Sequence, residues 1–485
     1  MKLIDGSGVN GLMKLWIYQF YLLAKLSWPF LIQQLDMSFV KDLERSIMTK
    51  LKKWARVGRT TEVGVLFRSK AHFGLGLTSL TMHYRLMQVV NCQLLKDSAD
   101  EDIVALFAEK TKKEGEFVRV WRSSQLSAQA DAEVKLVRRF PSQQGRRGLG
   151  AGNFVAEPSP ALRRKLVSQV VRSFEEEKAM SHVVSLAQQS VWTQWADTAL
   201  PFDLSWRNLL HGPGPHVIGF VLNASLNWVK TPDLLKTWGY KSNAKCVLCQ
   251  AEQCTLHHML SGCSTALRQK RYTWRHDSVL AHIEAVLRPH VENTEGKEER
   301  LPPISKSFVK AGEVRSTTTR RRRKNLLDGA KDWKMEVDYD NNHYVFPPEI
   351  YSTNERPDIV IWSAVLRKVI LIELTCPAEE GILPAQARKE AKYNDDLVPG
   401  ISGQEWTSIL MTIEVGARGY VAKSVRRCLY NLGVPRRDTQ RLIHTLSRVV
   451  AKCSYTILQS HEIANWESGR PLLRPEPTEV HEHAA

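Results

Sequence analysis

The stretch ERPDIVIWSAVLRKVILIELTCPAEE, residues 355–380, decides the fold of this chain. Two short apolar runs rich in β-branched residues, 359–362 and 369–374, are separated by a polar piece of turn length. This pattern predicts an antiparallel pair of buried strands. Asp358 opens the first predicted strand and Glu373 closes the second, so both carboxylates are expected at strand ends.

Two carboxylates placed in this way can bind a divalent cation, Mg2+, which prefers oxygen ligands and keeps open positions for water and phosphate. A bound cation generates hydroxide and neutralises the charge that develops at phosphorus. Lys389 and Lys392 are three residues apart on the predicted helix that follows, so either can reach the same phosphate. The alternative is structural: Asp358 caps a strand and Glu373 pairs with a neighbouring basic side chain.

Four segments together carry a resemblance to a known family: ERPDIVIW, KVILIELTCPAEE, ARKEAKYNDDL and TSILMTIEVGARGYV. They resemble the restriction-like endonuclease of site-specific non-LTR (LINE-like) retrotransposon proteins, a branch of the PD-(D/E)xK nucleases. The lysine expected two residues after the second acid is replaced by Thr375. In the retrotransposon branch the following helix supplies it, which implies Lys392 as our first choice and Lys389 as the second. Tyr393 also matches the family, although packing on the sheet explains it equally well.

A second motif combines cysteines and a histidine in the order Cys246-x2-Cys249-x8-His258-x4-Cys263. Four such ligands leave no open position on the metal, which predicts a structural Zn2+. Residues 244–264 are too few to build a core, so metal binding would supply much of their folding free energy. His257 competes with His258, and Cys254 lies close by. The segment TLHHMLSGC resembles a retrotransposon pattern in which the second histidine is the ligand. The alternative is a helix that buries cysteines by chance.

Three further segments are candidates for nucleic-acid binding. The family follows its zinc knuckle with a segment like RYTWRHDSVL, in which Arg275 and His276 would touch nucleic acid or the knuckle; a solvated polar face explains them almost as well. Five consecutive cations predict contact with a nucleic-acid backbone or a nuclear import signal. They are Arg320, Arg321, Arg322, Arg323 and Lys324. Lys52 and Lys53 lie on a basic N-terminal helix.

The N-terminal region is expected to be helical, since apolar residues recur at spacings of three and four from residue 12 to 54. Pro29 predicts that a first helix ends near Ser27 and that a second spans residues 37–56. A basic bundle of this kind can bind a duplex through its phosphates. It resembles the thumb of the reverse transcriptase of the same elements, and an ordinary helical bundle is the alternative. Another long helix is expected at residues 160–195.

The composition favours a polyanionic partner, with 68 Lys and Arg against 51 Asp and Glu and a formal net charge of +17. Eight cysteines in 485 residues fit a reducing compartment. No uncharged apolar run approaches the roughly 20 residues of a membrane helix. The polymerase palm hairpin, which ends in two aspartates, does not occur. We therefore expect no polymerase activity, and the chain looks like the C-terminal part of a longer element product.

The sequence thus predicts a multidomain α + α/β protein whose nuclease contains a central mixed sheet. The expected segments are a thumb-like bundle (1–95), a helical linker (96–240), a CCHC zinc knuckle with its following helix (241–290), a basic linker (291–332), a restriction-like endonuclease (333–466) and a disordered tail (467–485). The resemblance implies a nuclear enzyme that nicks target DNA with Mg2+ to prime copying of the element RNA. An inert or domesticated nucleic-acid-binding fragment, or part of a full-length reverse transcriptase, are the alternatives.

Overall fold

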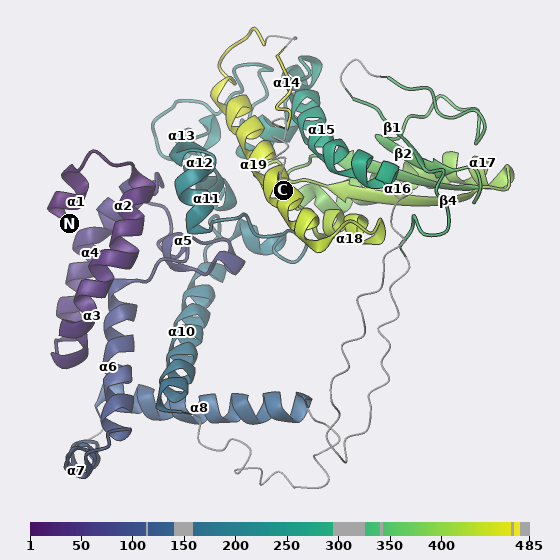
Figure 1. Ribbon diagram of the computed structural model, residues 1–485. Coiled ribbons are helices and arrows are strands. Elements are labelled where there is room, and N and C mark those ends of the chain that lie inside the picture. The colour runs from purple at the N-terminus through teal and green to yellow at the C-terminus, as the bar shows by residue number, and fades with distance from the viewer. Residues whose placement is uncertain (113–114, 140–158, 294–324, 340–342, 467–469, 476–485) are drawn as a thin grey trace, which may run out of the picture. The chain divides into compact units, whose positions relative to one another are not determined.

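The structure is a computed structural model that describes residues 1–112, 115–139, 159–293, 325–339, 343–466 and 470–475 (Figure 1). The chain divides into two compact units, which is a coarser division than the six predicted segments. The first contains Met1–Thr193 and Leu204–Trp228, and the second contains Gln194–Asp203 and Val229–Ala485. Within the described ranges, no helix has both the length and the apolar character needed to cross a bilayer.

The first unit is helical, as predicted. Its elements are α1 (Lys2–Gly6), α2 (Gly11–Ile17), the π-helix η1 (Tyr18–Leu22), α3 (Leu23–Ile32), α4 (Met37–Trp54), α5 (Gly64–Phe67), η2 (Lys70–His72), α6 (Leu80–Lys96), α7 (Glu101–Lys110), α8 (Glu116–Arg139), α10 (Pro160–Val184), α11 (Trp206–His211) and α12 (Pro215–Ser225). Phe107, Trp121 and Val171 join α7, α8 and α10 to α6 in one apolar cluster. The Trp121 indole donates to Gln93 Oε1 at 3.0 Å, so its buried N–H is satisfied.

Two predicted helix ends in this unit are wrong. α3 continues through Pro29 to Ile32 instead of ending near Ser27. Its buried Phe30 packs edge-on against Tyr84, with ring centroids 5.2 Å apart, and Gln88 donates to the Phe30 carbonyl. These tertiary contacts offset the free energy of the helix hydrogen bond that Pro29 cannot make. α10 ends at Val184, well before the predicted residue 195.

The second unit contains the predicted sheet. Its strands are β1 (Lys334–Val337), β2 (Ile359–Ser363), β3 (Lys368–Thr375) and β4 (Thr407–Glu414), and its helices are η5 (Val191–Gln194, shared with the first unit), α13 (Pro232–Thr237), η6 (His258–Gly262), α14 (Ser264–Arg268), α15 (Arg271–Glu292), η8 (Glu379–Gly381), α16 (Ile382–Asp395), α17 (Leu397–Gly403), α18 (Lys423–Asn431) and α19 (Arg436–Gln459). The strand order is β1-β2-β3-β4. The first two pairings are antiparallel, as predicted for β2 and β3, and β3 with β4 is parallel, which makes the sheet mixed.

Side chains that alternate along the strands place the sheet between two helical layers. Ile361 and Ile372 face a core that includes α15, α18 and α19, of which α15 and α19 lie side by side in Figure 1. Val360 and Leu371 face a second core that includes α16 and α17. The helix that follows the knuckle, α15, is therefore an integral part of the core under the sheet.

The segment predicted as a disordered tail, residues 467–485, is described only at residues 470–475. Residues 470–475 pack along α15, where the Trp274 indole donates to the Pro471 carbonyl at 3.0 Å. The Arg470 guanidinium lies 5.3 Å from the Trp274 ring centroid and 5.2 Å from that of Trp466. A cation placed over two indoles gains cation–π attraction that composition alone does not reveal. Residues 467–469 and 476–485 lie outside the described residues.

Candidate functional site

The register of β2 and β3 brings the two predicted acids together. Ile359 pairs with Ile372, so Asp358 stands opposite Glu373. The Asp358 backbone N–H donates to Glu373 Oε2 at 3.3 Å, and the Leu374 N–H donates to Asp358 Oδ2 at 2.7 Å. Both carboxylates line an open cavity of about 310 Å3. The sequence alone therefore located this pair, because adjacent strands with a short connection leave few possible registers.

Glu373 is the more buried of the two acids, with 3% of its surface exposed. The Tyr393 hydroxyl donates to Glu373 Oε2 at 2.9 Å, and Lys389 Nζ contacts Oε1. Burial, followed by the neighbouring Asp358 carboxylate, raises the pKa of Glu373 above its usual range, against the opposing effects of Lys389 and Tyr393. Two close carboxylates in a partly buried place repel each other, so additional positive charge stabilises them.

The structure distinguishes the two candidate lysines on α16. Lys389 lines the cavity and contacts Glu373. Lys392 Nζ instead lies 2.6 Å from Glu355 Oε2, at a half-exposed position. Tyr393 is buried and packs on the α16 side of the sheet, as one of its two expectations had it, and its hydroxyl also contacts Glu373. A spacing of three residues on one helix did not distinguish the two lysines. In the structure they contact different carboxylates, Glu373 for Lys389 and Glu355 for Lys392.

His276, expected to touch nucleic acid or the knuckle, reaches the acids from α15. Its Nε2 lies 3.4 Å from Asp358 Oδ2 and 3.3 Å from the Leu374 carbonyl oxygen. Its Nδ1 lies 2.9 Å from Asp277 Oδ1. Burial lowers the pKa of His276, but Asp358 and Asp277 outweigh burial and hold this pKa well above its usual value. An imidazole with carboxylates at both ring nitrogens is fixed in orientation.

The predicted metal ligands also come together. The donor atoms of four residues lie within 4.8 Å of one another, and they are Cys246, Cys249, His258 and Cys263. The Cys246 and Cys263 sulfurs are 3.9 Å apart, and Cys249 Sγ is 3.3 Å from His258 Nε2. This cluster could hold a metal ion such as zinc. His257 points elsewhere, toward Glu380.

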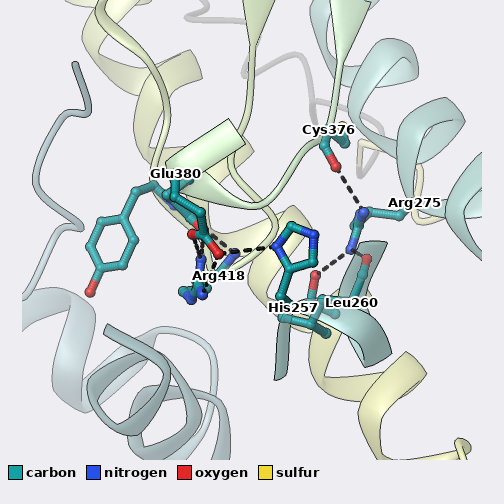
Figure 2. A network of polar contacts seen from close by, with 9 residues as sticks. His257, Leu260, Arg275, Cys376, Glu380 and Arg418 are labelled. Carbon is teal, nitrogen blue, oxygen red and sulfur yellow. Dashed lines mark hydrogen bonds and ion pairs between the residues drawn. The ribbon is translucent and has the colours of Figure 1, made fainter. Parts of the chain in front are cut away.

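A polar network joins this cluster to the segment after β3 (Figure 2). Arg275 is 1% exposed and donates to the carbonyls of Leu260 and Cys376, both at 2.9 Å. His257 Nδ1 lies 3.1 Å from Glu380 Oε1, and Glu380 also accepts from Arg418. Arg275 is therefore a structural cross-link. Arg275 was expected to touch nucleic acid or the knuckle, and its bond to the Leu260 carbonyl confirms the second alternative. Its guanidinium is buried, which does not favour the first.

The other predicted nucleic-acid contacts fall into three cases. Lys52 is 9% exposed and donates to the carbonyls of Arg59 and Thr61 at 2.7 and 2.6 Å, so its ammonium is used inside the first unit. That prediction is wrong, because the position faces the bundle interior. Lys53 is exposed and lies 3.4 Å from Asp5. The cations at residues 320–324 lie outside the described residues.

Two comparisons with known proteins find no match for this chain. No protein-family model matches the chain, and a search of curated proteins finds no similar sequence. The structure contributes two sites that bear on function, an acid pair with Lys389 at the end of β3 and a four-residue Cys/His cluster.

Proposed function

We propose that the protein is the DNA-nicking portion of a non-LTR retrotransposon protein and that it hydrolyses phosphodiesters with Mg2+. The observation that carries the hydrolytic activity is the adjacency of Asp358 and Glu373 in a cavity that Lys389 also lines, while the family rests on the sequence resemblance. Carboxylate oxygens in this number suit Mg2+, which is held by one or two carboxylates and keeps its remaining positions for water and phosphate. Conversion of supercoiled plasmid to the nicked form in Mg2+ tests it.

In this proposal Asp358 and Glu373 would hold the cation, which lowers the pKa of bound water and neutralises developing charge. The chain's own residues prepare the site. The Leu374 N–H fixes one Asp358 oxygen, and the Tyr393 hydroxyl fixes one Glu373 oxygen. Lys389, which contacts Glu373 beside the cavity, would stabilise the charge that develops on the scissile phosphate. The target would be duplex DNA, the further partner the element RNA, and the compartment the nucleus.

The Cys/His cluster would hold a structural Zn2+, since it supplies three sulfurs and one imidazole nitrogen and no open position. Its network with Cys376 and Glu380 lies directly after the strand that carries Glu373. The ion would thus support the nuclease as well as the knuckle.

Lys389→Met and Lys392→Met proteins are expected to differ strongly in nicking rate. Loss of Lys389 removes the cation beside Glu373 and should lower kcat on the order of a hundredfold, as for other preorganised transition-state donors. Loss of Lys392 breaks a half-exposed ion pair with Glu355 and should cost less than about fivefold. Single-turnover plasmid nicking measures both, and the opposite order would assign the catalytic role to Lys392.

His276→Leu is expected to weaken divalent-metal binding by about 10- to 100-fold, the usual effect of losing a side chain that orients a metal ligand. His276→Gln should retain most of the affinity, because its amide can still donate to Asp358 from a similar position. Mn2+ titration followed by electron paramagnetic resonance measures binding without any turnover. Equal affinity of the leucine and wild-type proteins would show that His276 does not position Asp358.

A further inference from the structure

Two side chains beyond the four-residue motif reach the Cys/His cluster. His461 Nε2 lies 3.6 Å from Cys246 Sγ and 3.6 Å from Cys254 Sγ. Cys246 and Cys254 are fully buried and His461 is 4% exposed. The three donor atoms lie within 4.8 Å of one another. His461 follows α19 and is 215 residues from Cys246, so no motif spacing points to it.

The four motif residues supply as many donors as a tetrahedral zinc site needs. Zn–S bonds of about 2.3 Å and Zn–N bonds of about 2.0 Å give tetrahedral edges of roughly 3.3–3.8 Å. The observed separations, 3.9 Å between the Cys246 and Cys263 sulfurs and 3.3 Å between Cys249 Sγ and His258 Nε2, lie at or within about 0.1 Å of this range. His461 shares only Cys246 with this set, since its own donor-atom group consists of Cys246, Cys254 and His461. With the four positions of the ion taken by the motif residues, a donor beside Cys246 would act on the ligand and not on the ion.

A hydrogen-bond donor beside Cys246 would stabilise the negative charge on the metal-bound sulfur. Three thiolates and one neutral imidazole around Zn2+ leave one excess negative charge, and burying it without hydrogen-bond donors is costly. The Cys249 N–H reaches Cys246 Sγ at 3.5 Å. An Nε2–H on His461 would be a second donor to the same sulfur. The Cys254 sulfur lies at the same distance from that nitrogen and would share this donor. Partners that hydrogen-bond to metal ligands commonly set metal affinity.

The backbone around His461 is built to hold the ring there. Arg271 is fully buried and donates to the Ser460 and Ile463 carbonyls, each at 2.8 Å. Gln269 donates to the Ala464 carbonyl at 2.6 Å. Residues on both sides of His461 are thus fastened to the start of α15, and its ring is directed into the cluster.

We propose that His461, with Cys254 beside it, belongs to the metal site, where its Nε2–H donates to the metal-bound Cys246 sulfur. Metal binding at the knuckle is thereby coupled to the end of α19. Because α19 packs in the core under the sheet, loading of the cluster also orders the C-terminal border of that core. The inference concerns metal binding and does not depend on nuclease activity.

The test is Zn2+ affinity of the whole chain, measured by competition with a chromophoric chelator. His461→Leu should bind Zn2+ about 10- to 100-fold more weakly, whereas His461→Gln should recover most of the affinity through its amide N–H. His282→Leu removes another buried histidine of the same unit, far from the cluster, and should bind as wild type does. The charge-transfer band of the Co2+-loaded protein should shift in the leucine variant alone.

Three outcomes would overturn the proposal. The first is unchanged affinity in His461→Leu. The second is two Zn2+ per wild-type chain falling to one in that variant, which would make His461 a direct ligand of a second ion. The third needs no variant: hydrogen exchange of residues 460–466 that is equal in the metal-loaded and metal-free wild type would show no coupling. This last measurement decides the matter even where His461→Leu does not fold.

Discussion

Asp358→Asn should lower plasmid nicking by on the order of a thousandfold, because a bound cation contributes several kcal/mol to transition-state stabilisation and the amide is a poor ligand for it. The change is nearly isosteric. It keeps an oxygen that can accept from the Leu374 N–H, so the strand end should hold its position. Duplex DNA binding, measured by fluorescence anisotropy, should stay close to wild type, since one ligand is lost and no basic residue is altered.

Asp395→Asn is the matched control, because Asp395 is exposed at the end of α16 and lines no part of the cavity. It should nick as the wild type does. Equal nicking by Asp358→Asn and wild type would remove the nuclease assignment. DNA binding without nicking by the wild-type protein would instead favour the nucleic-acid-binding fragment, in which Lys389 is simply the permanent partner of Glu373.

The acid pair was predictable because its determinants are local. Two β-branched runs joined by a short turn fix the pairing of β2 with β3, and that register alone places Asp358 against Glu373. The Cys/His cluster was predictable for the same reason, since its spacing lies within 18 residues of sequence, Cys246 to Cys263. The fold class followed from the same patterns, helices in the first unit and a mixed sheet in the second.

Contacts between distant segments could not be predicted. The pattern of α15 shows an apolar face but not that this face lies under the sheet, and this packing is what brings His276 to Asp358 and buries Arg275. Lys52 looked like a surface cation because its helix is basic, whereas the loop at Arg59 and Thr61 supplies carbonyls that enclose it. Pairings of this kind depend on tertiary packing, which no local spacing encodes.

Cys263→Ala should abolish stoichiometric Zn2+ binding and strongly destabilise the second unit. Structural zinc contributes about 10–16 kcal/mol of apparent binding free energy in small metal-dependent domains. The destabilisation would extend beyond the knuckle into the core under the sheet. Tyr272 donates to the His258 and Met259 carbonyls. Arg275 links the Leu260 carbonyl to that of Cys376. Zinc content by atomic emission and the urea midpoint of unfolding measure the two effects.

Cys453→Ala separates metal loss from loss of a buried sulfur, since Cys453 is fully buried in α19 and belongs to no donor cluster among the described residues. It should keep one Zn2+ per chain and lose only about 1–2 kcal/mol of unfolding free energy, the cost of a small cavity. Chelation should then lower the urea midpoint of the wild type and of Cys453→Ala while leaving Cys263→Ala unchanged. A midpoint in Cys263→Ala that still falls on chelation would mean that the ion is held without Cys263.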